Sequence, residues 1–183
     1  MNPEHNTTLA ETLPTQASAQ ESAAVRQVGG DPCGAARAAA VKGDLEDAVV
    51  ILQEHVTNAP SDGRAWNDLG VMEHAQGRPQ EAEQCFARAV SCNPQDAIAL
   101  QNLVDLYVQT QRYEMAVLLA RQWTDSLPQD ANAWAALAAL QLTAGDVEAG
   151  RASLDIAGRL APDNGAVARA RALLDQGNEP SEE

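Results

Sequence analysis

Residues 60–96 read PSDGRAWNDLGVMEHAQGRPQEAEQCFARAVSCNPQD, and this stretch decides the fold. A proline followed two positions later by an aspartate stands at each end, as Pro60 with Asp62 and Pro94 with Asp96. Proline cannot continue a helix, and an aspartate side chain accepts a hydrogen bond from a free backbone N–H at a helix start. The pattern therefore predicts that one helix stops and another begins at both ends of the stretch.

This pattern, a proline followed two positions later by aspartate or asparagine, recurs every 34 residues along the chain. A sustained period of that length indicates stacked repeats rather than a single globular core. A repeat stack presents an extended surface, so the period favours binding over catalysis. The four pairs are Pro60 with Asp62, Pro94 with Asp96, Pro128 with Asp130, and Pro162 with Asn164.

Each unit is predicted to be two antiparallel helices. In the second unit Trp66 and Leu69 share one helical face, Gly77 marks a turn, and Ala82 and Phe86 follow at helical spacing. Small residues recur at one equivalent position, where two helices can approach closely. These small residues are Ala48, Ala82, Ala116 and Gly150, and the predicted turns are Gly43-Asp44, Gly77-Arg78, Gln111-Arg112 and Gly145-Asp146.

The pattern Trp66, Leu69, Gly70, Ala82, Phe86, Ala89, Pro94 resembles the tetratricopeptide repeat signature. The resemblance implies an all-α fold, a right-handed superhelical α-solenoid of antiparallel helix pairs. It departs from the family at Glu73, where Tyr is common, and at Pro32, where Trp is usual. Asp31 and Pro32 would still start a shortened helix. About four repeats and a capping helix are expected, at 29–62, 63–96, 97–130, 131–164 and 165–176.

The flanks of this 29–176 domain carry other signals. Residues 1–17 are polar and are expected to form a disordered tail, as is the acidic stretch 177–183. Ser18 with Glu21 resembles a capping box, which predicts a short extra helix over 18–28.

Composition limits the partners. The formal net charge of −14 argues against nucleic acid and against anionic membranes. The sequence lacks both an apolar stretch long enough to span a membrane and the apolar region of a secretory signal, so we expect a cytoplasmic protein. Lys42 is the only lysine, and the excess of arginine and alanine is typical of a GC-rich bacterial genome.

Motifs for catalysis, cofactors and metals are missing from the sequence. It contains no Gly-rich phosphate loop, no His-Glu-x-x-His and no Cys-x-x-Cys. The histidines belong to different predicted segments and the cysteines lack ligand spacing, so we expect reduced thiols, no cofactor, no metal and no enzyme. The residues concerned are His5, His55, His74, Cys33, Cys85 and Cys92.

The family resemblance implies a concave groove lined by the first helix of each repeat. Amide side chains there could pair with a peptide backbone, whereas the alternative is a merely solvated face. The carboxylates Asp68 and Asp105 favour a neutral or basic partner segment. The candidate groove residues are Arg37, Arg64, Asn67, Asp68, Val71, His74, Gln101, Asn102, Asp105, Gln109, Asn132, Ala136 and Leu142.

The leading functional prediction is a non-catalytic adaptor, scaffold or assembly factor that binds a peptide or helix of another protein in this groove. The alternative is a small acidic chaperone of a bacterial secretion system, similar to the type III class II group, and an enzyme ranks third. Self-association is not indicated. In either binding function Trp66 is expected to be a core residue whose loss costs a few kcal/mol.

Overall fold

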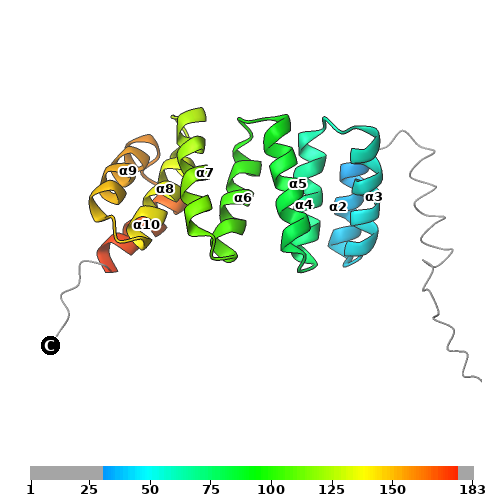
Figure 1. Cartoon of the computed structure of the whole chain (residues 1–183), viewed down its shortest axis with the longest axis horizontal. Coiled ribbons are helices and arrows are strands. Elements are labelled where there is room, and N and C mark those ends of the chain that lie inside the picture. Colours follow the sequence, from blue (N-terminus) through cyan, green and yellow to red (C-terminus); the bar gives the residue numbers. More distant parts are fainter. Residues whose placement is uncertain (1–30, 177–183) are drawn as a thin grey trace, which may run out of the picture.

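The computed structural model describes residues 31–176, and in this range the chain is a single row of α-helices (Figure 1). The all-α repeat fold is thereby confirmed. The segments 1–17, 18–28 and 177–183, for which tails and an extra helix were predicted, lie outside the described residues. The helices of the described range are α2 (Pro32–Lys42), α3 (Leu45–Asn58), α4 (Gly63–Ala75), α5 (Pro79–Cys92), α6 (Ala97–Gln109), α7 (Tyr113–Ser126), α8 (Ala131–Thr143), α9 (Val147–Leu160) and α10 (Gly165–Gln176).

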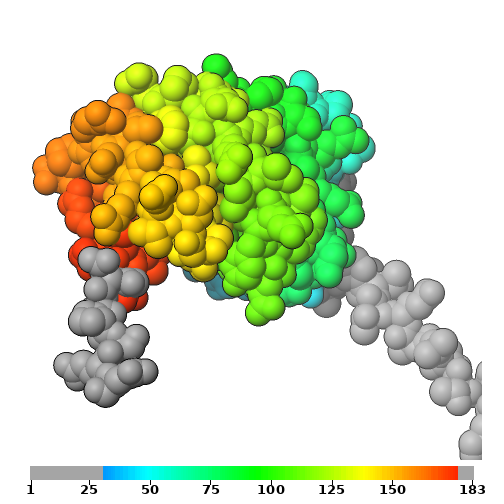
Figure 2. All heavy atoms as spheres, turned by 60° about the vertical axis from the view of Figure 1, so that its left-hand side comes forward, coloured from blue at the N-terminus to red at the C-terminus, as the bar shows by residue number. Residues whose placement is uncertain are grey.

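Consecutive helices pack as hairpins, and the hairpins stack in chain order. The pairs are α2 with α3, α4 with α5, α6 with α7, and α8 with α9. The second helix of each pair packs against the first helix of the next, and α10 packs on α8 and α9 at the end of the row. Figure 2 shows α8, α9 and α10 together at this C-terminal end of the stack. The first helices of the four hairpins, followed by α10, therefore succeed one another along the stack in the order α2, α4, α6, α8 and α10.

The predicted caps start the first helices. Asp62 accepts a hydrogen bond from the backbone N–H of Ala65, and Asp96 accepts two from the first turn of α6. Asp130 and Asn164 cap α8 and α10 in the same way. Asp31 differs: α2 does begin at Pro32 as expected, but the Asp31 side chain makes no cap bond.

Inside each hairpin the chain reverses through one residue with positive φ. Gly43, Gly77 and Gly145 take this conformation in three of the units, with φ between 73° and 94°. Gln111 takes it in the remaining unit at a φ of 59°. A left-handed conformation costs a residue with a side chain roughly 1–2 kcal/mol, so packing of α6 on α7 must hold Gln111 there.

The small residues of the signature allow the two helices of a hairpin to touch. A Cβ built on Gly70 would lie 2.6 Å from the Phe86 ring, and one on Gly150 would lie 2.6 Å from Leu142 Cγ. Ala48, Ala82 and Ala116, which stand at the position of Gly150, are completely buried. The predicted close approach is confirmed.

The core runs along the stack as three adjoining clusters. The central cluster joins α5 to α8 around Trp123, which is 1% exposed and is the largest fully buried side chain of the described residues. Trp66 is only partly buried at the edge of the N-terminal cluster, and its Nε1 donates to the Pro60 carbonyl at 2.9 Å. The expectation for Trp66 is corrected accordingly: Trp123 is the central tryptophan.

A buried carboxylate replaces the aromatic residue usual at position 73. Glu73 is 2% exposed, lies 3.0 Å from Arg78 Nε, and accepts a hydrogen bond from Gln53 at 3.3 Å. Arg78 is 41% exposed at its side chain, so the pair reaches from the core to the solvent. This pair ties the end of α4 to the start of α5.

In the described range we find no helix whose length and apolar character would let it cross a membrane.

Candidate binding groove

Polar side chains join the first helices of neighbouring repeats. Asn102 Nδ2 on α6 donates to Asn67 Oδ1 on α4 at 2.8 Å, and the equivalent contact at the end of the stack joins Asn164 to Asn132 at 3.0 Å. Because each contact spans one repeat, these pairs fix the spacing of α4 and α6 and of α8 and α10. Both pairs lie on the surface formed by the first helices, which we call the inner face.

Two further pairs lie among the same helices. Arg37 on α2 forms an ion pair with Asp68 on α4 at 2.6 Å. The Asp68 carboxylate accepts from Arg37 and raises the pKa of that guanidinium. The Nε2 atom of His74 on α4 lies 2.7 Å from the Oε1 atom of Gln109 on α6. Most of the polar side chains predicted to line the groove are therefore already paired with one another in the structure without a partner.

Two adjoining hollows open on the inner face, and we call them together the inner groove. The larger, about 370 Å³, lies among α6, α8 and α10, and the smaller, about 170 Å³, lies among α4, α5 and α6. Asp105 lines both. The larger hollow has a mainly apolar wall with Gln101, Asp105, Asn132 and Arg169 as its polar members. Its remaining lining residues are Trp123, Ala135, Ala136, Ala139, Ala166, Ala170 and Leu173.

Asp105 has a distinct electrostatic setting in the groove. Removal of water by the surrounding side chains raises the pKa of its carboxyl group. A hydrogen bond from Gln101 and the positive charge of Arg169 act in the opposite direction but do not cancel this effect. Asp105 is still exposed on α6, so water screens part of this effect and the fold disfavours the ionisation of its carboxyl group only weakly.

We expect Asp105→Asn to raise the thermal unfolding temperature at neutral pH. The folded wild type binds a proton at Asp105 more tightly than the unfolded chain, so its ionised form is penalised above that raised pKa. The penalty should shrink as the pH falls from the raised folded pKa toward the ordinary pKa of an unfolded aspartate, and the two melting temperatures should converge below that ordinary pKa. Circular dichroism melts across that pH range measure the gap.

Asp155→Asn, at an exposed position of α9, is the charge-matched control for the loss of one negative charge. A gap between Asp105→Asn and the wild type that stays the same at every pH would contradict the assignment.

The structure brings most of the predicted groove residues together. Val71, His74, Asn102, Asp105 and Gln109 share the smaller hollow. Gln101, Asn132 and Ala136 line the larger one with Asp105.

The other predicted residues lie apart from the hollows. Arg37 and Asp68 pair near the N-terminal end, and Arg64 is exposed on the first turn of α4. Asn67 is 8% exposed and holds Asn102. Leu142 covers Gly150 on α9 within its own hairpin.

Sequence reasoning missed some of the lining of the groove. Trp123 belongs to a second helix, α7, yet it reaches the floor of the larger hollow. Ala166, Ala170 and Leu173 belong to α10. Extending the repeat register into the capping helix would have found these three residues. They stand 34 positions after Asn132, Ala136 and Ala139.

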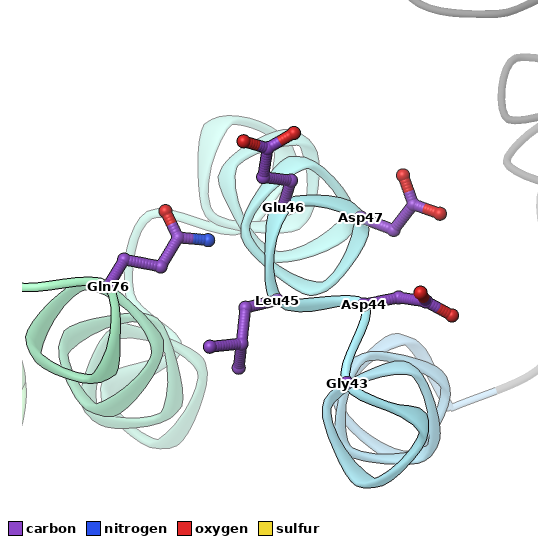
Figure 3. A pocket seen from close by; sticks show the side chains of 6 residues that line it. All are labelled: Gly43, Asp44, Leu45, Glu46, Asp47 and Gln76. Atoms are coloured by element: carbon purple, nitrogen blue, oxygen red, sulfur yellow. The ribbon is translucent and has the colours of Figure 1, made fainter.

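Two other hollows lie away from the inner face. One of about 590 Å³ between α7 and α8 is lined mainly by apolar side chains, including Tyr113 and Leu118. The other, about 550 Å³, lies at the turn between α2 and α3 and includes Asp44, Glu46 and Asp47. Figure 3 shows the Asp44 and Asp47 carboxylates on the same side of the turn and the Glu46 carboxylate pointing away from them, so the three do not converge on a common ligand.

Comparison with known proteins agrees with this architecture. Two family models, both described as tetratricopeptide repeat, match residues 33–97 and 73–140. Together they cover the chain from the first described repeat into α8. A comparison with curated proteins found no match.

Solved structures share the fold at low sequence identity. A tetratricopeptide repeat protein from Parabacteroides merdae ATCC 43184 is 20% identical with a TM-score of 0.70, over 80% of this chain and 59% of that one. This chain thus spans about three fifths of that protein. MamA residues 41-end from Desulfovibrio magneticus RS-1 is 16% identical with a TM-score of 0.61, over 82% of this chain and 99% of that one.

A third structure is YrrB, described as a tetratricopeptide repeat protein with an unusual peptide-binding site. It is 13% identical with a TM-score of 0.64, over 87% of this chain and 84% of that one. At sequence identities this low, the similarity between this chain and the three solved structures shows a shared fold alone.

Proposed function

Because the chain belongs to the tetratricopeptide repeat family, we propose that it is an adaptor or assembly factor whose inner groove binds a segment of another protein. Members of this family are in general interaction modules, and the fold supports that coarse function here. The finer statement, which face binds and what it binds, is the proposal.

The observation that carries the proposal is the larger hollow among α6, α8 and α10. Five of its eleven lining residues are alanines on α8 and α10, and these small side chains leave room for side chains from a partner. Its rim offers Gln101 and Asn132, whose amides can each donate and accept a hydrogen bond. An apolar floor with a few convergent polar groups is the usual form of a binding site.

The charge of the groove suggests the chemistry of the partner. Asp105 stands at the junction of the two hollows, and the whole chain carries a formal charge of −14. An acidic segment would meet repulsion, whereas a neutral or basic helix or peptide would be attracted. Arg169, which also lines the larger hollow, offers a hydrogen-bond donor for one backbone carbonyl of that segment.

The paired amides set a condition on binding. Asn102 already donates to Asn67, and Asn164 already donates to Asn132. A partner backbone therefore bonds the donors and acceptors that these pairs leave over, and the pairs hold the amides in place for it. Preorganisation of this kind reduces the entropy lost on binding.

Ala136→Arg tests the proposal. The arginine would fill the larger hollow from its wall, and we expect a partner isolated with the wild-type chain to bind the variant at least about tenfold more weakly, or about 1.4 kcal/mol. Isothermal titration or surface plasmon resonance with that partner measures the change.

Ala152→Arg is the matched control, since Ala152 is exposed on α9 and does not line the groove. It should bind as the wild type does. Equal affinity of the two arginine variants would place the binding surface elsewhere on the molecule.

A further inference from the structure

A cysteine, a histidine and an aspartate from three different helices meet at the N-terminal end of the stack. Cys33 lies in the first turn of α2, His55 in the last turn of α3, and Asp62 is the N-cap of α4. Cys33 Sγ, one His55 ring nitrogen and one Asp62 carboxylate oxygen all lie within 4.8 Å of one another. The His55 Nε2 and Asp62 Oδ2 atoms are 2.9 Å apart.

The repeat register shows that this cluster is not a requirement of the fold. Trp123 stands where His55 stands two repeats earlier, and its Nε1 donates to Asp130 at 3.2 Å, the equivalent of the His55–Asp62 contact. A ring N–H on the following cap is therefore enough to join the repeats. The first repeat adds a thiol to that contact and replaces indole with imidazole, which can coordinate a metal.

The charges around the cluster favour a cation. Asp31, Asp62 and Asp68 all act on Cys33 with negative charge, and Arg37 is the positive group that acts on it. Arg37 is already paired with Asp68 at 2.6 Å. The field at the thiol is thus net negative, which attracts a dication.

The same field argues against a catalytic thiol. Burial, followed by the nearby carboxylates, raises the pKa of Cys33, whereas an enzyme nucleophile needs a lowered one. Zinc binding displaces the proton of a cysteine thiol, because the thiolate is the form that coordinates the metal. Zinc accepts this mixed set of sulfur, nitrogen and oxygen ligands.

We infer that Cys33, His55 and Asp62 form a zinc site that clasps the first repeat onto the second. Tetrahedral zinc with bonds of about 2.0–2.3 Å places its ligand atoms roughly 3.3–3.8 Å apart. The thiol would move inward and the His55–Asp62 pair would open slightly. The His55 and Asp62 side chains are 22% and 36% exposed, so water can fill the fourth position. Asp62 keeps its other oxygen for the cap bond to Ala65.

Cobalt is the first probe, because a thiolate–cobalt bond absorbs light where zinc does not. The untagged full chain, stripped of metal and kept reduced, should bind one Co²⁺ with a sulfur charge-transfer band, and Zn²⁺ should remove that band. Competition with a chromophoric chelator then gives the zinc affinity. We expect Cys33→Ser to lose the band and to bind zinc at least about tenfold more weakly.

Two variants separate the metal site from the hydrogen bond. Asp62→Asn keeps an oxygen for the Ala65 cap, so the fold is retained while one anionic ligand is lost; it too should weaken zinc binding. Cys92→Ser is the matched control, because Cys92 is exposed and its sulfur lies outside the cluster. It should keep the wild-type band and affinity.

A wild-type chain that binds no stoichiometric zinc would overturn the inference. So would a Cys33→Ser or Asp62→Asn chain that is folded by circular dichroism and binds zinc as tightly as the wild type.

Discussion

We expect the free energy of unfolding of the Trp123→Ala variant to be about 3–5 kcal/mol lower than that of the wild type, which is the range for tryptophan-to-alanine changes in a core. Trp123 is 1% exposed and sits in the central cluster, which joins the packing of α5 through α8. Its indole N–H also donates to the Asp130 carboxylate, so the change removes a hydrogen bond to the cap of α8.

Urea denaturation followed by circular dichroism measures this loss, and a thermal melt should show a fall of roughly 6–20 °C for a chain of this size. Trp66→Ala removes the same side chain from a partly buried position and should cost clearly less. In a stack each repeat depends on its neighbours, so the damage should spread beyond α7. Equal losses for the two variants would mean that the central cluster is not the main support of the stack.

The second large effect is expected at Arg78→Ala. Removing one partner of a buried ion pair costs about 3–5 kcal/mol, because the other charge is left without compensation. Glu73 is 2% exposed, but Gln53 still donates to it and Arg78 reaches the solvent. We therefore expect a loss below that range, about 2–3 kcal/mol.

A second substitution tests the mechanism. Glu73→Gln, added to Arg78→Ala, removes the stranded charge and should restore part of the lost stability. Denaturant midpoints of the two single variants and the double variant form a complete cycle. A double variant no more stable than Arg78→Ala would show that the charge of Glu73 is not the source of the loss.

Much of the fold could be predicted from the 34-residue period. The period predicted the helix starts at Asp62 and Asp96, the turn at Gly77 and the close helix approach at Gly150, because each depends on the residue type at one repeat position. Burial within the core was harder to predict. Trp66 and Trp123 have the same residue type, and only the packing of α7 between its neighbours decides which is enclosed.

The groove was partly predictable for the same reason. Repeat register placed Gln101, Asn102 and Asp105 on one helix, where the hollows are found. It did not reveal that Asn67 and Asn102 bond each other, since that contact depends on the distance between α4 and α6. The Cys33 cluster was missed because its residues are far apart in sequence and meet only where three helix ends converge.

The most direct test of the central claim is a cross-linking map of the partner complex. A photoreactive residue placed at Gln101 or Ala136 lies on the inner groove, and one placed at Ala152 lies on the exposed side of α9. We predict cross-links to the partner from the first two positions and none from the third. Efficient cross-linking from Ala152 together with none from Gln101 or Ala136 would contradict a partner held in the inner groove.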